Sequence, residues 1–486
     1  MDRDARTGPA PATPTPPARA PAPETGTGAP PARPHEQAVV PFRTAVRAWF
    51  LISLQTFGGP AGQIAVMQRT LVDEKRWIGQ RRFLHALNYC MLLPGPEAQQ
   101  LATYVGMLLH GTRGGLVGGG LFVLPGLVAL LVLSAIYVAF GSTTAVLAVF
   151  AGLAPAVLAI VAQAVVRVAK RALNSRAVVV IAVAAFLALA LFGVPFPVVV
   201  ALAGLAGWAL GRWRPAALPQ KAKAEAADAG PPPVISDDVL HTETPATRRT
   251  LKVLLIGLLV WGAPVAAVAL LTGAHSVFTQ QGLFFSGASI VTFGGAYAVL
   301  AYVAQQAVAV YGWLAPGEMV RGLALAETTP GPLISIVIFV AFLGAYRDPG
   351  SLDPWVAAVL ASLLVTWVTF VPSILFVLLG APYMERLRGN RSLSAALTGI
   401  TAAVVGVIAN LGVYFAIHTL FADTVRLDSA VLNLELPNLG TLRPVALGIA
   451  VVAAVLLFRL KWSVLRTLGV CAALGLAAGL AGLPVG

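Results

Sequence analysis

The sequence predicts an all-α polytopic membrane protein made of two homologous repeats of inverted topology, with helices broken at Gly-Gly-Pro and Pro-Gly-Pro turns. Three observations support this fold class. Of the 486 residues, 58% are hydrophobic and only 11% are charged, whereas soluble domains carry about 25% charged residues. The same short motifs occur twice at a fixed spacing. Finally, the basic residues of corresponding loops indicate opposite membrane sides.

Duplicated motifs define the two repeats. Gly and Pro are unfavourable in the middle of an apolar helix, so interruptions that recur at one spacing indicate a duplicated architecture. Where both copies interrupt a hydrophobic segment, we expect the interruption to carry the function. The pairs 236 positions apart are Phe57-Gly58-Gly59 with Phe293-Gly294-Gly295, Trp77 with Trp313, and Pro94-Gly95-Pro96 with Pro330-Gly331-Pro332; Pro125 with Pro372 and Gly152 with Gly399 follow at 247.

Polar intervals divide the chain into five predicted parts. Thirteen apolar segments flank one long polar interval, six before it and seven after it, and the odd segment between the repeats inverts the second one. The parts are a disordered Pro/Ala-rich cytoplasmic tail over 1–41, a first repeat over 42–214, a cytoplasmic linker over 215–250, an extra transmembrane helix over 251–277 and a second repeat over 278–486.

Loop charges test the inversion independently, because short cytoplasmic loops collect Lys and Arg. In the first repeat, Arg167, Lys170 and Arg171 follow the apolar segment that ends near residue 166. In the second repeat, basic residues precede the corresponding segment, whereas Asp423 and Glu435 follow it. The repeats are therefore predicted to be antiparallel in the plasma (inner) membrane, with the N-terminus in the cytoplasm.

The same rule bears on the broken segments of the first repeat. The stretch 69–82 contains five Lys and Arg residues, and Arg43, Arg47 and Arg113 on either side of it also indicate the cytoplasm. If each broken segment crossed the membrane fully, the basic stretch would lie outside. Re-entrant hairpins that turn at Gly-Gly-Pro and Pro-Gly-Pro keep all the basic clusters inside, and the sequence favours them. Such turns must be buried in protein or line a cavity.

The interrupted helices predict an anion site. A Pro in the first turn of a half-helix loses no hydrogen bond, and Pro60, Pro96 and Pro332 suit that position, with Ala296 in place of a fourth Pro. A helix start offers free N–H groups and a partial positive charge of roughly half a unit. Adjacent glycines allow an anion to approach the backbone.

Polar side chains near these turns complete the predicted site, although any one of them could equally form an ordinary helix–helix hydrogen bond. The predicted substrate-binding residues are Phe57, Gly58, Gly59, Pro60, Gln63, Asn88, Pro94, Gly95, Pro96, Gln99, Gln100, Phe293, Gly294, Gly295, Thr328, Thr329, Pro330, Gly331 and Pro332.

Two carboxylates beside the turns are candidates for proton coupling. An intramembrane carboxylate is costly and suggests function, and burial favours its protonated form. Glu97 has an alternative role as a partner of the helix dipole in a first turn. Glu327 lies three residues before its Pro-Gly-Pro and has no such alternative.

Several other functions are excluded. Cys90 and Cys471 lie in apolar segments with no CxxC or His nearby, which is typical of small buried hydrophobes. Nucleotide-binding, hydrolase and metalloprotease motifs are absent, so we expect no enzyme, no cofactor and no metal. The net charge of +13 is spread over short runs between apolar segments, which argues against nucleic-acid binding.

Five sequence runs carry a family resemblance: Phe57-Gly58-Gly59-Pro60, Leu92 to Gln100, Phe293 to Leu300, Gly312-Trp313-Leu314 and Leu325 to Leu333. They resemble the chromate ion transporter family in its long, two-domain form, over roughly residues 42–484. The resemblance implies a bacterial plasma-membrane protein that exports chromate with the proton motive force and confers chromate resistance. The family is described with thirteen spans and oppositely oriented halves. The expected partners are a chromate oxyanion and the lipid bilayer.

Other functions remain open from the sequence. Chromate and sulfate are tetrahedral dianions of similar size, so the same fold could serve a transporter or exchanger of sulfate or another oxyanion. An anion channel is a further alternative. The sequence leaves the oligomeric state undetermined.

Overall fold

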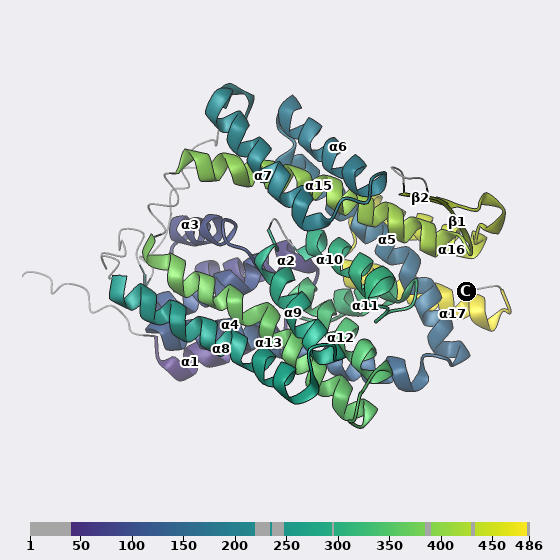
Figure 1. The fold of residues 1–486 in the computed structure, drawn as a ribbon, viewed down its shortest axis with the longest axis horizontal. Coiled ribbons are helices and arrows are strands. Elements are labelled where there is room, and N and C mark those ends of the chain that lie inside the picture. Colours follow the sequence, from purple (N-terminus) through teal and green to yellow (C-terminus); the bar gives the residue numbers. More distant parts are fainter. Residues whose placement is uncertain are drawn as a thin grey trace, which may run out of the picture. The chain divides into compact units, whose positions relative to one another are not determined.

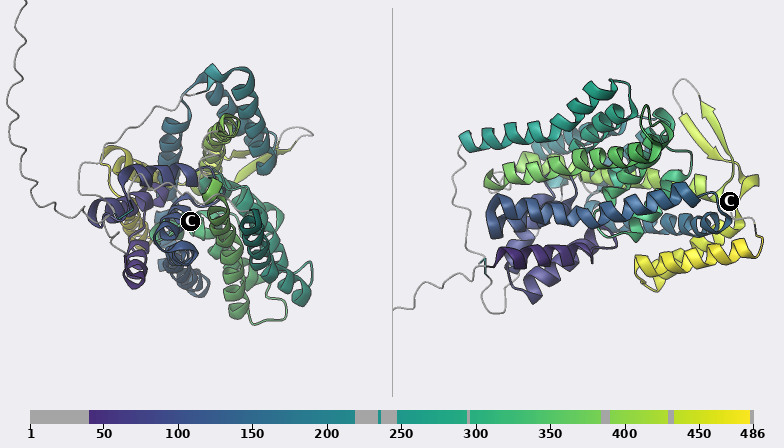
Figure 2. Two further views of the ribbon diagram at one scale, coloured as in Figure 1. Left: turned by 90° about the vertical axis from the view of Figure 1, so that its left-hand side faces the viewer. Right: turned by 90° about the horizontal axis from the view of Figure 1, so that it is seen from below.

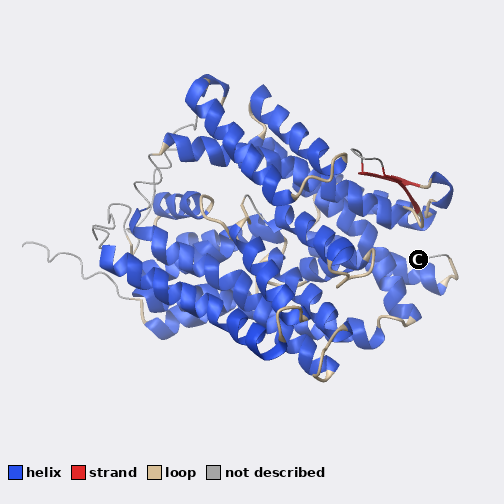
Figure 3. Ribbon diagram, viewed as in Figure 1, coloured by secondary structure: helices blue, strands red, loops and turns tan. Residues whose placement is uncertain are grey.

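A computed structural model describes residues 40–218, 234–235, 247–293, 296–383, 390–428 and 433–483. The predicted tail to residue 39, most of the linker, and Gly294 and Gly295 lie outside the described residues. The described part is almost entirely helical (Figure 3). Six of its helices are long and apolar enough to cross a membrane, which confirms an all-α polytopic membrane protein. They are α4 (Glu97–Phe140), α5 (Thr144–Ala172), α7 (Phe196–Trp213), α8 (Thr247–Thr272), α13 (Pro354–Gly380) and α15 (Arg391–Leu420).

Short helices surround each predicted break in the first half. One break separates α1 from α2, and the Pro-Gly-Pro turn separates α3 from α4. Helix α2 continues as a π-helical segment, η1, before the basic loop. The remaining elements are α1 (Phe42–Ser53), α2 (Gly59–Gln68), η1 (Arg69–Glu74), α3 (Gln80–Cys90), α6 (Arg176–Ala190) and η2 (Pro215–Ala217).

The second half shows the same order of elements around its two breaks. It again has a π-helical continuation after the first break, but the helix after the second break is short, whereas α4 in the first half is long. Helix α8, which precedes this half, begins at Thr247 and not at 251, because its polar first turn precedes the apolar segment. The elements are α9 (Val277–Ile290), α10 (Ala296–Gln305), η3 (Gln306–Val310), α11 (Glu318–Thr328), η4 (Leu333–Ser335), α12 (Ile336–Arg347), η5 (Ala381–Tyr383), α16 (Pro444–Ala454), η7 (Val455–Arg459) and α17 (Val464–Leu480).

Helix α4 is a helical hairpin and not one straight helix. Its backbone leaves helical geometry at His110 (φ −140°) and Gly111 (φ 60°, ψ −152°). The backbones of Gly106 and Gly114 touch across the turn, and a Cβ on Gly118 would lie 2.7 Å from the carbonyl oxygen of Ala102. Residues 97–109 therefore run antiparallel to 112–140, and glycines allow the two backbones to approach closely.

One small sheet departs from the helical pattern. Strands β1 (Thr424–Asp428) and β2 (Asn433–Pro437) pair antiparallel and are followed by η6 (Leu439–Thr441). The pair stands at one end of the helices, beside α15 and α16 (Figures 1 and 2). In the first half the corresponding connection, between α5 and α6, is only residues 173–175.

The packing places the second Pro-Gly-Pro hairpin deep in the core. Helix α12 is buried from Ile336 to Ala345 and packs against α4, α11 and α13. Helix α15 packs against α5, α6 and α7, while α16 and α17 pack against α5. By contrast, α8 packs against α13 and α9 and buries only Val265, as a helix that faces lipid would (Figure 1).

Candidate functional site

The broken segments of the two halves meet through a reciprocal pair of backbone hydrogen bonds. The N–H of Gly95 donates to the carbonyl oxygen of Thr292 at 2.7 Å. The N–H of Gly331 donates to the carbonyl oxygen of Thr56 at 3.0 Å. Each Pro-Gly-Pro turn is thus bound to the residue that precedes Phe-Gly-Gly in the other half. Although 236 positions separate the two copies, they form one centre.

Glycine is required at both turns by the backbone itself. Gly95 has φ +127° and Gly331 has φ +104°, a region that side chains rarely adopt. At the first Phe-Gly-Gly motif, Gly58 and Gly59 are also left-handed, with φ values of 79° and 75°. Each break is followed at once by a helical start, at Gly59, Glu97, Ala296 and Leu333. Four sets of first-turn N–H groups therefore lie beside the breaks.

Three predicted glutamines are buried at this centre. The amide of Gln63 donates to the carbonyl oxygen of Gly331, and that of Gln100 donates to Pro94 at 2.7 Å. The amide of Gln99 reaches the carbonyl oxygen of Phe370 on α13 at 3.4 Å. Side chains of the first half thereby contact the turns of both halves.

Other predicted residues lie less centrally. The hydroxyls of Thr328 and Thr329 donate to carbonyl oxygens of their own helix, at 2.7 and 2.9 Å. Asn88 is exposed on α3, and Phe57 and Phe293 are half-buried. Pro60 lies in the first turn of α2, and Pro96 and Pro332 immediately precede α4 and η4.

The structure adds hydroxyl groups that sequence reasoning missed. Thr369 and Ser373 on α13 and Ser335 after the second turn are each at most 3% exposed, and their hydroxyls have no partner among the described residues. The sequence carried one signal for Ser373, since it follows Pro372, a landmark of the repeat. Its position in a continuous apolar helix gave no sign that it faces a turn in the other half.

The two candidate carboxylates occupy different environments. Glu327, at the end of α11, is 3% exposed and accepts a hydrogen bond from the hydroxyl of Tyr297 at 2.6 Å. Glu97 is half-buried at the start of α4. Tyr297 lies on α10, the helix after the Phe-Gly-Gly break, and Glu327 lies on α11, the helix before the Pro-Gly-Pro turn. Their hydrogen bond therefore joins the two helices that lie between these breaks.

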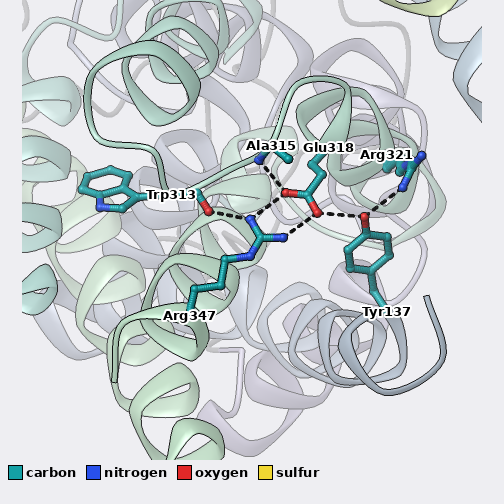
Figure 4. Close-up of polar contacts among 6 residues, drawn as sticks. All are labelled: Tyr137, Trp313, Ala315, Glu318, Arg321 and Arg347. Atoms are coloured by element: carbon teal, nitrogen blue, oxygen red, sulfur yellow. Dashed lines mark hydrogen bonds and ion pairs between the residues drawn. The ribbon is translucent and has the colours of Figure 1, made fainter. Parts of the chain in front are cut away.

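A charged network holds the start of α11 (Figure 4). Glu318 is paired with Arg347, whose guanidinium donates two hydrogen bonds at 2.7 and 2.8 Å. The N–H of Ala315 donates to Glu318 at 2.7 Å, and the hydroxyl of Tyr137 donates at 3.1 Å. Arg321 in turn donates to Tyr137 at 3.1 Å. Helices α4, α11 and α12 are thereby tied together at one end.

A cavity of about 1680 Å³ opens near this network, between α5, α10, α11, α15 and the β-hairpin. Ala301 of α10 lines it, and Tyr297 lies four residues earlier on the same face of that helix. The pair of Tyr297 and Glu327 is therefore one helical turn from the cavity wall. The polar residues of the lining include Gln305, Arg321, Asn410, His418, Glu435 and Arg443.

This arrangement defines a class of protein. Helices interrupted near the middle of a multi-pass membrane fold, with free helix termini and buried polar groups at the interruptions, are typical of secondary transporters. Among the described residues, no group of three His, Cys, Asp or Glu side chains could hold a metal ion.

The chain belongs to the chromate transporter family, which confirms the resemblance seen in the sequence. The family model, chromate transporter, matches residues 44–208 and 279–480, one stretch in each half. The chain is 32% identical to the chromate transport protein of Pseudomonas aeruginosa over 88% of this chain and 89% of that protein. It is 28% identical to the chromate transport protein of Cupriavidus metallidurans, over 77% and 82%. A probable chromate transport protein of Synechococcus elongatus is 26% identical, over 73% and 79%. No solved structure matches the chain.

Proposed function

We propose that this protein is a secondary transporter that exports chromate from the cytoplasm across the inner membrane and thereby confers chromate resistance. The observation that carries the proposal is the centre where the two Pro-Gly-Pro turns are bound to the opposite halves, in a chain whose relatives are chromate transport proteins. Helix starts and neutral polar side chains at this centre suit an oxyanion.

The proposed topology has two inverted repeats, a cytoplasmic N-terminus and re-entrant hairpins. Helices α1 and α3 contain 12 and 11 residues, so they span only about 18 and 16 Å of a hydrocarbon core about 30 Å thick. The imidazole of His110 lies 2.8 Å from the carbonyl oxygen of Val40, which places the start of α1 beside the α4 turn. This geometry supports a basic loop on the same side as the N-terminus.

Cysteine labelling of intact cells tests this topology. Both native cysteines are buried, so background labelling should be low. Asp73→Cys, in the exposed end of η1, should resist a membrane-impermeant maleimide, whereas Ser351→Cys, exposed in the loop after α12, should react. Labelling of both positions from outside would exclude the re-entrant arrangement.

The transport cycle that we propose rearranges the two crossing hydrogen bonds. The bonds from Gly95 and Gly331 join the repeats at the centre, so movement of one repeat against the other must exchange them. The cavity beside α10 and α15 is the outer exit in this scheme, since its β-hairpin side carries Asp423 and Glu435, as an external surface does.

Energy for export comes from the membrane potential and the proton gradient. Moving a dianion out of a negative interior releases about 4.6 kcal/mol per 100 mV, because each charge contributes roughly 2.3 kcal/mol. We assign proton exchange to Glu327, supported by its complete burial, its bond to Tyr297 and its place near the cavity. A charged carboxylate is costly at such a position unless it is paired or protonated.

Chromate flux into proteoliposomes with imposed pH and voltage gradients tests the proposal. We expect saturable chromate uptake that increases when the vesicle interior is positive. It should also increase when the interior is more acidic than the outside, because chromate then enters in exchange for protons that leave. Competing sulfate measures whether the site prefers chromate. Flux that does not saturate would indicate a channel, and transport of sulfate without chromate would contradict the proposed substrate.

A further inference from the structure

The two Pro-Gly-Pro turns face different residues of the opposite half. A Cβ on Gly95 would lie 2.6 Å from the hydroxyl oxygen of Ser373, whereas the nearest atom to a Cβ on Gly331 is Cα of Gly126, at 3.5 Å. Gly126 and Ser373 are 247 positions apart, so they are equivalent residues of the two repeats. The first turn therefore meets a hydroxyl where the second meets bare backbone.

Buried polar atoms without a partner gather at the first turn. Among the described residues these are the side-chain oxygens of Gln99 and Gln100 and the hydroxyls of Thr369 and Ser373. All four residues are at most 3% exposed. Thr369 and Ser373 are four residues apart and share a face of α13, the helix that Gln99 also reaches. An unpaired buried polar group costs about 1–3 kcal/mol, so four such groups around one turn point to a binding site for a polar ligand.

The chemistry of these groups suits an oxyanion. The hydroxyls of Ser and Thr donate hydrogen bonds, and the NH₂ groups of Gln100 and Gln99 each carry a second N–H besides the one that reaches Pro94 or Phe370. The first-turn N–H groups of α4, from Glu97 to Gln99, lie at the same end of that helix. The N–H of Gly95 is bound to Thr292, so the ligand must be held largely by these other donors.

We propose that the first turn, Pro94–Pro96, holds the tetrahedral dianion, with Ser373 and Thr369 as specificity-determining donors beside Gln99 and Gln100. The second turn, Pro330–Pro332, serves as the packing counterpart against Gly126 and holds no anion. This assignment deepens the proposed function and rests on it. It makes the binding site asymmetric although the repeat is duplicated.

The test compares hydroxyl deletions at the two turns. Ser373→Ala and Thr369→Val remove the proposed donors, and Ser335→Ala removes an unpaired buried hydroxyl at the second turn. Ser362→Ala is a control on the same helix, since its hydroxyl is already bonded to Ile338 and Ala358. The measurements are the KM and maximal rate of chromate flux, and the thermal stability of the purified variants without anion.

We expect Ser373→Ala to raise the KM for chromate roughly 10-fold or more, as a hydrogen bond to a charged group implies. Thr369→Val should also raise the KM. In the two comparison variants, Ser335→Ala and Ser362→Ala, the KM should stay within about twofold of the wild-type value. The loss of an unpaired hydroxyl should leave thermal stability unchanged or higher, which separates ligand binding from a structural role. A wild-type KM in both deletions, or an equal increase in Ser335→Ala, would overturn the assignment.

Sulfate binding to the purified protein separates this inference from the proposed function. If the wild type moves no chromate but is stabilised by sulfate, and Ser373→Ala abolishes that stabilisation, the transport proposal fails and the subsite stands. If chromate flux is normal in the wild type and in Ser373→Ala, only the subsite fails. Absence of both sulfate and chromate binding in the wild type would refute both.

Discussion

The two Pro-Gly-Pro turns have the same local sequence, the same left-handed glycine and the same backbone bond to the opposite half. They nevertheless differ in their surroundings. The first faces Ser373 and lies among buried polar atoms without partners, whereas the second packs on Gly126 and follows Glu327, which is bonded to Tyr297. The two turns thus share one backbone geometry, and in the proposed scheme the different helices packed against them give the first turn an anion role and the second a proton role.

The largest expected difference is between Gly95→Ala and Gly331→Ala. Both place a side chain at positive φ, which costs about 1–3 kcal/mol. Only the first also drives a methyl group into Ser373 and Gln100. Gly95→Ala should abolish chromate flux, while Gly331→Ala should retain part of it. Flux per unit of membrane-inserted protein measures the difference, and equal losses would show that the turns are equivalent.

The next largest expected effect is on chromate flux when the buried carboxylate of Glu327 is replaced. Glu327→Gln keeps the size of the side chain and an oxygen for Tyr297 but cannot exchange a proton. Flux driven by a pH gradient alone should fall at least about tenfold, whereas flux driven by voltage should persist. Glu97→Gln is the matched control and should keep the pH response. Loss of that response in Glu97→Gln alone would move proton coupling to the first turn.

The charged network should affect stability and not substrate affinity. Glu318 has no acidic counterpart in the first half, where the residue 236 positions earlier is Arg82. Glu318→Gln weakens the pairing with Arg347, whose side chain is 43% exposed, so we expect a loss of about 1–2 kcal/mol. Thermal unfolding in detergent measures it. A higher KM at unchanged stability would instead place the network in substrate binding.

The smallest expected effects distinguish the roles of Gln63 and Gln100. Gln63 donates to the second turn and Gln100 to the first. Gln63→Leu should cost about 1 kcal/mol of stability, the net value of one hydrogen bond, with little change in KM. Gln100→Leu should raise the KM for chromate as well. The opposite pattern, in which only Gln63→Leu weakens chromate binding, would exchange the roles of the turns.

Much of the fold could be predicted because it depends on local composition. Apolar stretches such as that of α5 mark their own membrane spans, and Pro and Gly disrupt helices wherever they occur. The break in α4 at His110–Gly111 falls in the short polar stretch with Arg113 that separates two apolar segments of the sequence, so its position could be predicted as well. The close contact of its two arms at Gly106 and Gly114 could not, because it depends on tertiary packing. The β-hairpin was not predicted, because each of its strands has only five residues. In the sequence, this region was noted only as a loop with acidic residues.

The candidate site, like the fold, could be predicted from the sequence only in part. The sequence by itself determined the fold class, the family, the positions of the four breaks and the need for glycine at Gly95 and Gly331, because these follow from residue type and spacing. Only the tertiary structure decided that Gly95 meets Thr292, that Ser373 faces the first turn and that Tyr297 bonds Glu327. Contacts between segments far apart in the chain depend on how helices pack, and no local pattern encodes which face of a uniformly apolar helix will meet its partner.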